Sequence, residues 1–302
     1  MSKKYLAHLA LLVVNLIYGG SHFIAKTVMP DYLTPNVFIF FRVLSATLLF
    51  WILRIFVKEK VAKKDLGLMA VCGVFGVALN QLLFFQGLSI TSPVDSAIIM
   101  VSSPVIVTFL SFLILKSKLT KTKVSGILLG LIGAIFLIYL GDAESSKISS
   151  LKGNLFILAN ATSYSLYIVL VKPLMKKYKP ITVISYVFLF GLVIVFPFGI
   201  SEMSEITWAF PNEIILAIGF IILFTTFITY LFNIFGVKYL SPIITSSYIY
   251  LQPVFAMVIG LMISWYGNND TYVQSITWEK IACTLLIFIG VFLTSFNFKA
   301  KD

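Results

Sequence analysis

Four of the ionisable residues in the apolar runs that are long enough to enter a lipid bilayer could take part in chemistry. His22 and Lys26 are one helical turn apart in the first run, Arg42 lies in the second, and Asp95 lies at the start of the fourth. A charged side chain inside a bilayer is costly, so such residues usually face protein or water and mark a path for a substrate or a proton. We therefore interpret His22 and Arg42 as facing a polar cavity.

Lys26 and Asp95 also have simpler explanations. Lys26 lies near the outer end of its run, where a long side chain reaches the headgroups, and we interpret it in that way. Asp95 is the natural partner of Arg42 by depth, but it also follows Ser92 and Pro93, where a carboxylate caps a helix start. The two roles of Asp95 are compatible. Because His22 and Asp95 are the intramembrane groups that can titrate usefully, proton coupling would involve one of them or an acid in an outer loop.

Neutral polar residues recur along the same runs. Asn15, Tyr18 and His22 follow one another at spacings of three and four, which places them on one stripe of a helix. Packing through interhelical hydrogen bonds, worth about 0.6 kcal/mol each, explains any single one of these residues. As a set they fit a cavity with few charges and many amides and hydroxyls. The candidate substrate-binding residues are Asn15, Tyr18, His22, Arg42, Asn80, Gln81, Asp95, Ser102, Tyr164, Tyr167, Asn233, Tyr250 and Gln252.

The elements that position these residues are predicted transmembrane helices. Of the 302 residues 59% are hydrophobic and 12% are charged, whereas about a quarter of the residues in a soluble domain are charged. Runs of about 20 apolar residues can each cross about 30 Å of hydrocarbon, and backbone in lipid must pair internally as a helix. We predict an all-α polytopic membrane protein with ten spans: 5–28, 36–57, 66–88, 92–115, 124–141, 152–172, 181–200, 213–236, 242–265 and 278–297.

The charge distribution predicts the orientation of these spans. Basic residues gather in alternate connections, and most acidic residues lie in the others, so the net charge of +11 indicates topology and not a nucleic-acid partner. The first run is too long for a signal peptide and lacks a small-residue cleavage site, so we interpret it as an uncleaved first helix. We expect a multi-pass protein of the cell membrane, a bacterial inner membrane, with both termini cytoplasmic.

The sequence contains two copies of one unit. GLSITSPVDSAIIMVSSP from Gly87 and GVKYLSPIITSSYIYLQP from Gly236 share a glycine, a Ser-Pro pair and a second proline at identical offsets, and Tyr18–Lys26 aligns with Tyr164–Lys172. We predict five-helix repeats over residues 1–142 and 150–298. Because five is odd, the second copy starts on the opposite side of the membrane, which is the arrangement of many secondary transporters.

The shared residues predict local structure. Each Ser-Pro pair predicts a helix start, and Gly87 and Gly236 are expected to end the preceding helices. Pro104 and Pro253 each remove a backbone donor 11 residues into a helix. A tolerated kink is one interpretation; we favour a break or hinge that lines a central cavity, because both prolines lie at the same depth. The second-copy counterparts of His22, Arg42 and Asp95 are apolar, which favours a role in a ligand site, proton path or gate over a role in the fold.

Ten spans in two halves, a short basic amino end and the repeated G-x4-SP-x10-P pattern resemble the drug/metabolite transporter superfamily, in particular its EamA-type permeases. The resemblance covers the whole chain. It implies export or exchange of small metabolites through a cavity between the halves, lined chiefly by helices 1, 3, 4, 6, 8 and 9. It does not imply a particular substrate.

We therefore expect a secondary transporter, an exporter or exchanger, for a small polar metabolite such as an amino acid. The alternative is a carrier of lipid-linked or nucleotide-sugar type anionic substrates. The sequence has no HExxH, GxSxG or P-loop motif, so we expect no enzyme, catalytic residue, metal or cofactor. The expected partners are the substrate, the lipid bilayer and protons, and the chain is expected to be a monomer or weak homodimer.

Overall fold

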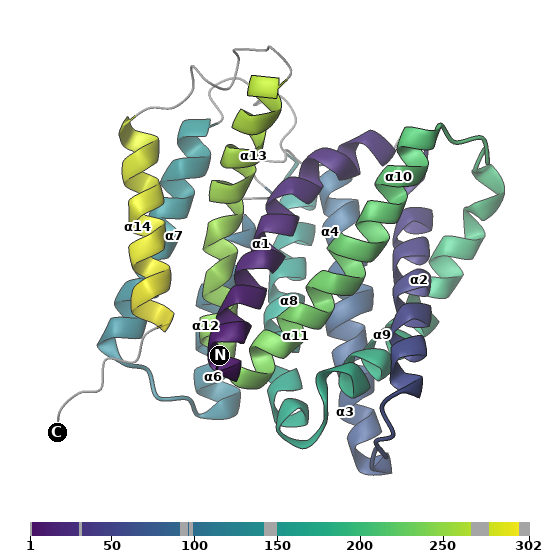
Figure 1. Cartoon of the computed structure of the whole chain (residues 1–302), viewed down its shortest axis with the longest axis horizontal. Coiled ribbons are helices and arrows are strands. Elements are labelled where there is room, and N and C mark those ends of the chain that lie inside the picture. Colours follow the sequence, from purple (N-terminus) through teal and green to yellow (C-terminus); the bar gives the residue numbers. More distant parts are fainter. Residues whose placement is uncertain are drawn as a thin grey trace.

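The protein is a bundle of helices (Figure 1). The computed structural model describes residues 2–29, 32–90, 96, 99–141, 150–266 and 278–295, and none of these lies in a β-strand. The first half of the chain forms α1 (Lys3–Val28), α2 (Pro35–Ile55), α3 (Lys63–Gly73), η1 (Val74–Ala78), α4 (Leu79–Ile90), α6 (Ser103–Leu115) and α7 (Lys121–Gly141). The second half forms α8 (Leu151–Lys177), α9 (Pro180–Ser201), η2 (Met203–Glu205), α10 (Asn212–Phe220), η3 (Ile221–Ile228), α11 (Thr229–Tyr239), α12 (Pro242–Ser247), η4 (Tyr248–Leu251), α13 (Gln252–Tyr266) and α14 (Trp278–Ser295).

Many of these helices have the length and apolar composition of transmembrane helices. Five described segments are long and apolar enough to cross a membrane: Pro35–Ile55, Lys63–Ile90, Leu151–Lys177, Pro180–Ser201 and Asn212–Tyr239. Large apolar side chains such as Phe109 and Leu216 are exposed on the outside of the bundle, which is the expected surface of a protein whose solvent is hydrocarbon. The chain is therefore a polytopic membrane protein, and the count of ten spans stays a prediction.

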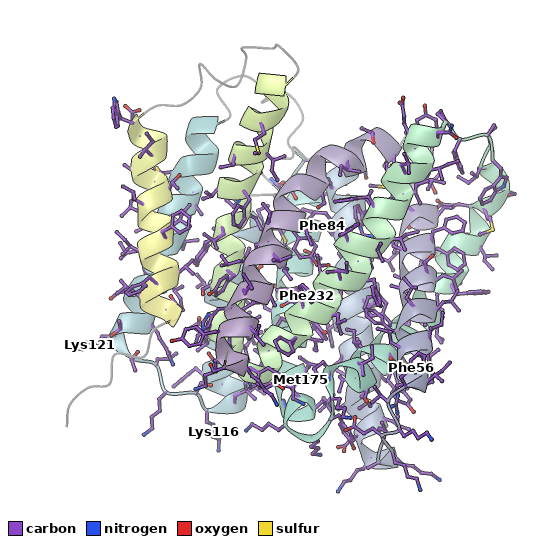
Figure 2. The ribbon with its side chains drawn as sticks, in the orientation of Figure 1. Phe56, Phe84, Lys116, Lys121, Met175 and Phe232 are labelled. Carbon is purple, nitrogen blue, oxygen red and sulfur yellow. The ribbon has the colours of Figure 1, made fainter. Side chains whose placement is uncertain are left out.

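One end of the bundle gathers basic segments. Lys3, at the start of α1, lies over the Tyr239 ring at the end of α11. The residue before Tyr239, Lys238, donates to the carbonyl of Tyr178, which follows α8. Lys116 lies at the same end as the amino terminus (Figure 2). We call this the basic end.

The opposite end carries an acidic contact. Glu202, which follows α9, accepts hydrogen bonds from Thr34 and Asn36 at the start of α2, both at 2.5 Å. We call this the acidic end. Helix α1 starts at the basic end, whereas α8, which begins the second copy of the repeat, stops there. The two repeats therefore run in opposite directions through the bundle.

Two π-helical segments occupy equivalent places in the two repeats. η1 interrupts the long helix 63–90, and η3 interrupts the long helix 212–239. When residue numbers in the first repeat are shifted by the distance from Gly87 to Gly236, η1 falls within η3. A π segment widens the helix by one residue per turn and is common at functional sites. Nothing in the sequence analysis predicted these two segments.

The helices that contain the two repeated prolines are interrupted. Ser102 is the last residue before α6, and Pro104 lies in the first turn of that helix. In the second copy the α-helix α12 ends at Ser247, a 3₁₀ stretch follows, and α13 then begins at Gln252 with Pro253 as its second residue. Both interruptions lie directly before the proline, whose missing N–H and ring disfavour an uninterrupted helix.

Gly87 and Gly236 do not end their helices, so that prediction is wrong. Helix α4 continues to Ile90, and α11 continues to Tyr239. A Cβ at Gly87 would lie 3.0 Å from the Gly153 carbonyl oxygen of α8, and a Cβ at Gly236 would lie 2.7 Å from Leu11 of α1. The glycines are needed because two helices approach closely there, which local sequence cannot reveal. By contrast, Ser241 caps α12 as expected, because its hydroxyl accepts the amide of Ile244.

Candidate substrate-binding site

Arg42 is a buried cation held by neutral groups. Arg42 lies on α2 and is 6% exposed. Its Nε donates to Thr226 Oγ1 of η3 at 2.9 Å. The guanidinium carbon lies 5.4 Å from the ring centre of Phe38 and 5.0 Å from that of Phe85, which are cation–π contacts. The one ion pair among the described residues joins Lys177 to Asp65, so no described carboxylate pairs with Arg42. The described residues therefore hold the Arg42 guanidinium through one hydroxyl and two aromatic rings.

The π segment η3 helps to place this contact. The Thr226 hydroxyl donates to the carbonyl of Ile221, five residues earlier, which is the spacing of a π turn. The same hydroxyl oxygen then accepts from Arg42. An arginine within a span costs about 3 kcal/mol unless it finds polar partners. The widened helix thus supplies a hydroxyl where the buried guanidinium needs an acceptor.

Tyr230 connects the two repeats at the centre of the bundle. Its hydroxyl lies 3.2 Å from both the Gly76 carbonyl oxygen of η1 and Asn80 Oδ1, and can donate to either. Gln81 Nε2 donates to the same hydroxyl at 3.5 Å. Gln81 and Tyr230 are equivalent positions of the two repeats, because the same number of residues separates them as separates Gly87 from Gly236. Residues at equivalent positions of the two repeats therefore meet, which places the centre of the bundle on the symmetry axis of the repeats.

Two further tyrosines from equivalent positions border this centre. Asn233 Nδ2 of α11 donates to the Tyr164 hydroxyl of α8 at 2.8 Å. Tyr18 of α1, the counterpart of Tyr164, lies beside Thr229 and near Arg42. We use the name polar core for the residues gathered here: Tyr18, Arg42, Asn80, Gln81, Tyr164, Tyr167, Thr226, Thr229, Tyr230 and Asn233.

The polar core contains acceptors without donors. Gln81 Oε1 and Asn233 Oδ1 are buried and accept no hydrogen bond in the structure. A buried amide oxygen without a partner costs about 1–3 kcal/mol, so each such atom requires an explanation, such as a functional role or a bound water or ion. The polar core therefore offers one cation and, on different helices, two amide oxygens that lack donors.

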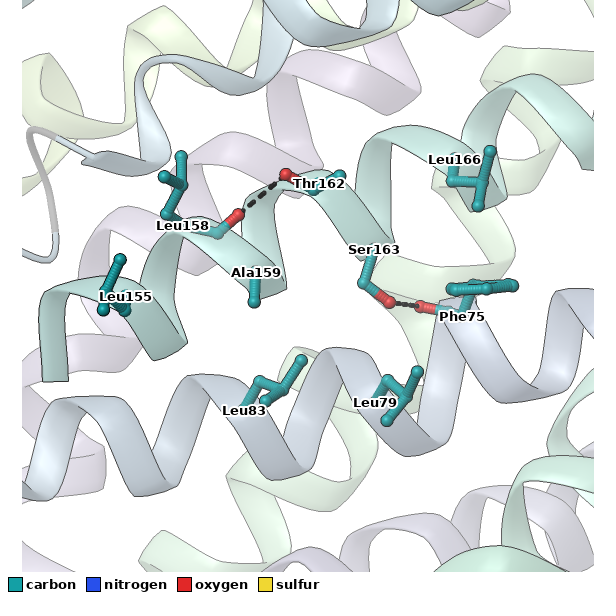
Figure 3. A pocket seen from close by; sticks show the side chains of 9 residues that line it. All are labelled: Phe75, Leu79, Leu83, Leu155, Leu158, Ala159, Thr162, Ser163 and Leu166. Atoms are coloured by element: carbon teal, nitrogen blue, oxygen red, sulfur yellow. Dashed lines mark hydrogen bonds between the residues drawn. The ribbon is translucent and has the colours of Figure 1, made fainter. Parts of the chain in front are cut away.

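A nearby groove has a different character. A cavity of about 450 Å³ lies between α8 and the η1–α4 segment, and leucines make up most of its lining. Thr162 and Ser163 are the hydroxyl residues of the lining, and they donate to the Leu158 and Phe75 carbonyls (Figure 3). The groove thus presents hydrocarbon with its hydroxyls already bonded, and it is a poor site for a polar metabolite.

Comparison with known proteins decides the family. The profile of the EamA-like transporter family matches residues 5–139 and again residues 151–296. The chain belongs to the EamA-like transporter family. The two matches fall on the two halves of the molecule, so a polytopic membrane fold with two repeats is established.

Relatives of this EamA-like protein are named as transporters. A Bacillus subtilis protein named "Uncharacterized transporter YyaM" is 29% identical over 85% of each chain. "Uncharacterized transporter YetK", also from Bacillus subtilis, is 25% identical and covers 100% of this chain and 90% of its own. A solved crystal structure with 15% identity covers 95% of each chain with a TM-score of 0.74, which supports the fold. The EamA-like chain is thus a membrane transporter, and an enzymatic role has no support in these names.

The structure brings together seven of the candidate residues predicted from the sequence. These are Tyr18, Arg42, Asn80, Gln81, Tyr164, Tyr167 and Asn233. The Tyr167 ring abuts the backbone of Gly76, where a Cβ would collide with it. The side chain of His22 and all of Asp95 lie outside the described residues, so the proposed pairing of Arg42 with Asp95 stays a prediction.

The other four candidates make contacts elsewhere. Gln252 Nε2 of α13 donates to Asn15 Oδ1 of α1 at 3.0 Å, which joins those two helices. The Ser102 hydroxyl donates to the carbonyl of Ile99 within its own turn. The Tyr250 ring packs against Gly130 of α7. The contacts of Asn15, Gln252 and Tyr250 hold helices together, whereas that of Ser102 is local.

Sequence reasoning missed Tyr230, Phe38 and Phe85. The signal for Tyr230 was present, because Thr226, Tyr230 and Asn233 follow one another at spacings of four and three on one helix face. No such signal exists for the phenylalanines, since an aromatic residue in a transmembrane run is normally read as packing. Only their distance to the Arg42 guanidinium distinguishes them.

Replacing Tyr230 by phenylalanine is expected to lower the transport rate about tenfold and the thermal unfolding midpoint by only a few degrees. The variant loses hydroxyl contacts to η1, Asn80 and Gln81, each worth about 0.6 kcal/mol of stability in a membrane protein. The same hydroxyl accepts from the amide of Gln81, a candidate substrate-binding residue. Transport and unfolding are measured on the same preparation. Tyr186→Phe is the control, since Tyr186 packs on Trp51 outside the polar core; equal loss in both variants would contradict the prediction.

Proposed function

We propose that this protein is a secondary transporter, an exporter or exchanger, for a small polar metabolite such as an amino acid. The observation that carries the proposal is the buried Arg42 guanidinium, held by Thr226 and two phenylalanine rings, beside two amide oxygens without donors. A guanidinium binds a carboxylate through paired hydrogen bonds. The amide oxygens of Gln81 and Asn233 accept from an ammonium group. A ligand that carries both a carboxylate and an ammonium group would bond to Arg42, Gln81 and Asn233 together.

The location of the polar core supports transport by alternating access. It lies where equivalent residues of two oppositely directed repeats meet, and inverted repeats commonly place a substrate site at such an interface. Interrupted helices before Pro104 and Pro253, together with η1 and η3, supply places where helices can bend. Rocking of one repeat against the other would then expose the polar core to each side of the membrane in turn.

A carrier of lipid-linked or nucleotide-sugar type anions is the second candidate. Arg42 favours an anionic group, but a phosphate-rich ligand requires several cations. Within the polar core as defined above, Arg42 is the one formal charge. A ligand with a single carboxylate matches that charge better.

A ligand screen by thermal unfolding of the purified protein tests the proposal. Amino acids are compared with their N-acetyl derivatives, which lack the ammonium group, with their amides, which lack the carboxylate, and with nucleotide sugars. A ligand at 100 times its Kd stabilises by about 2.7 kcal/mol, which is readily measured. We expect stabilisation by amino acids and not by either derivative. Stabilisation by nucleotide sugars alone would support the second candidate.

We further propose that the basic end is cytoplasmic, in a bacterial cell membrane, with both termini on that side and ten spans. The gathering of lysines at one end of the bundle supports this orientation. A carboxy-terminal fusion to a fluorescent protein that matures only in the cytoplasm tests it, and absence of fluorescence from an expressed fusion would contradict it.

Protons are the proposed coupling ion, through His22 or Asp95. The test is transport under a pH gradient in a His22→Ala and Asp95→Asn double variant. If the double variant responds to the gradient as the parent protein does, this coupling route fails.

A further inference from the structure

Two lysines cap each other's helices at the basic end. Lys172 Nζ of α8 donates to the carbonyls of Val237 and Leu240 at 2.6 Å and to that of Lys238 at 3.2 Å. In return, Lys238 Nζ of α11 donates to the Tyr178 carbonyl, which follows α8, at 2.8 Å. The last carbonyls of a helix have no partner inside it and carry partial negative charge. The two ammonium groups satisfy these carbonyls across the gap between α8 and α11.

This contact is tied to the other repeat. The Tyr178 hydroxyl donates to Asp65 Oδ2 of α3 at 2.7 Å, and Lys177 Nζ pairs with Asp65 Oδ1 at 2.7 Å. The backbone amide of Lys179 donates to Glu59 Oε2, in the connection before α3, at 3.0 Å. The α8–α11 contact therefore lies directly beside the junction between the first and second repeats.

The two repeats differ in the corresponding contact. Helices α8 and α11 touch each other near the basic end, and they are the first and third long helices of the second repeat. Their counterparts in the first repeat are α1 and α4, which over the described residues make at most marginal contact. Among the described residues, the two helices thus touch at the basic end in the second repeat, whereas the equivalent helices make at most marginal contact in the first repeat. An inverted-repeat transporter that differs in this way is closed toward one side of the membrane.

We propose that Lys172 and Lys238 form a latch that closes the path from the polar core to the basic end. This inference rests on the proposed function, because a latch has meaning only if the path opens in the other conformation. When the path opens, the two lysines lose their hydrogen bonds to the carbonyls and bond to water or lipid headgroups in their place. Long lysine side chains reach these easily at a membrane surface. The latch thus favours the closed state and still permits release.

The test measures access to Val237, which is fully buried and whose carbonyl accepts from Lys172. A Val237→Cys reporter is placed in a Cys72→Ala background, and the rate of maleimide labelling is measured in detergent by mass spectrometry. We expect Lys172→Met and Lys238→Met to raise the labelling rate about tenfold or more, because a hydrogen bond from a charged group contributes about 1.5–3 kcal/mol and each 1.4 kcal/mol is tenfold. Lys176→Met is the matched control, since Lys176 is exposed one helical turn further along α8.

Two results would overturn the latch. One is labelling of Val237→Cys at the parent rate in the Lys172→Met and Lys238→Met variants. The other is an equal rise at Cys283, a buried cysteine on α14, because that would show general loosening of the fold. The assay needs no substrate, so a failed ligand screen would count against the proposed function and leave the labelling result intact. Unchanged labelling with intact ligand binding would count against the latch alone.

Discussion

Replacing Arg42 by methionine is expected to reduce substrate binding and transport at least about a hundredfold. Methionine is close to arginine in length and apolar, so the variant removes the charge and the donors while keeping much of the volume. A hydrogen bond between charged groups contributes about 1.5–3 kcal/mol, and a carboxylate takes two from one guanidinium. The contact between Arg42 and Thr226 is also lost. Binding is measured by thermal stabilisation with the ligand identified in the screen, and transport by uptake into vesicles.

The companion variants distinguish a binding role from a structural one. Arg42→Lys keeps the charge and loses the paired donors, so we expect activity between the parent and Arg42→Met. The stability of Arg42→Met without ligand should equal or exceed that of the parent, because a buried cation is replaced by an apolar side chain. Full transport by Arg42→Met would remove Arg42 from the site. A large drop in ligand-free stability would indicate that Arg42 serves the fold.

Replacing Gly290 by valine is expected to lower the thermal unfolding midpoint by about 2–10 °C. A Cβ at Gly290 of α14 would lie 2.5 Å from the Gly130 nitrogen and 2.6 Å from the Gly126 carbonyl oxygen of α7. These are backbone atoms, so the two helices must move apart. Overpacking of a tight contact costs about 1–3 kcal/mol or more, which corresponds to several degrees. Small residues permit such close approach between membrane helices.

Gly219→Val is the matched control for Gly290→Val. It places the same side chain in α10, where a Cβ at Gly219 would meet nothing within 4 Å. Both variants carry the same loss of helical flexibility, so the difference between their unfolding midpoints reports the helix contact. Equal midpoints would show that the α7–α14 contact yields easily. The close approach of α7 and α14 at these glycines is a finding of the structure.

The membrane class, the repeats and the approximate helix bounds followed from the sequence, because they depend on local composition and spacing. The predicted span 181–200 compares with α9 at Pro180–Ser201, and 36–57 with α2 at Pro35–Ile55. A run of apolar residues has one stable arrangement in lipid, which is a helix. Arg42 was identifiable for the same reason: a charge in such a run is rare and costly.

The assembly of the site was decided by tertiary structure alone. Gln252 and Tyr230 both lie on helices predicted to line the cavity, yet Gln252 bonds Asn15, whereas Tyr230 reaches Asn80 at the polar core. Which face of a helix turns inward depends on how its neighbours pack, and a nearly all-apolar helix gives little periodicity from which to infer that face. Gly87 and Gly236 illustrate the same limit, since their role lies in contacts with Gly153 and Leu11. The sequence determined which residues are costly to place in lipid, and only the packing of the helices decided which of them meet.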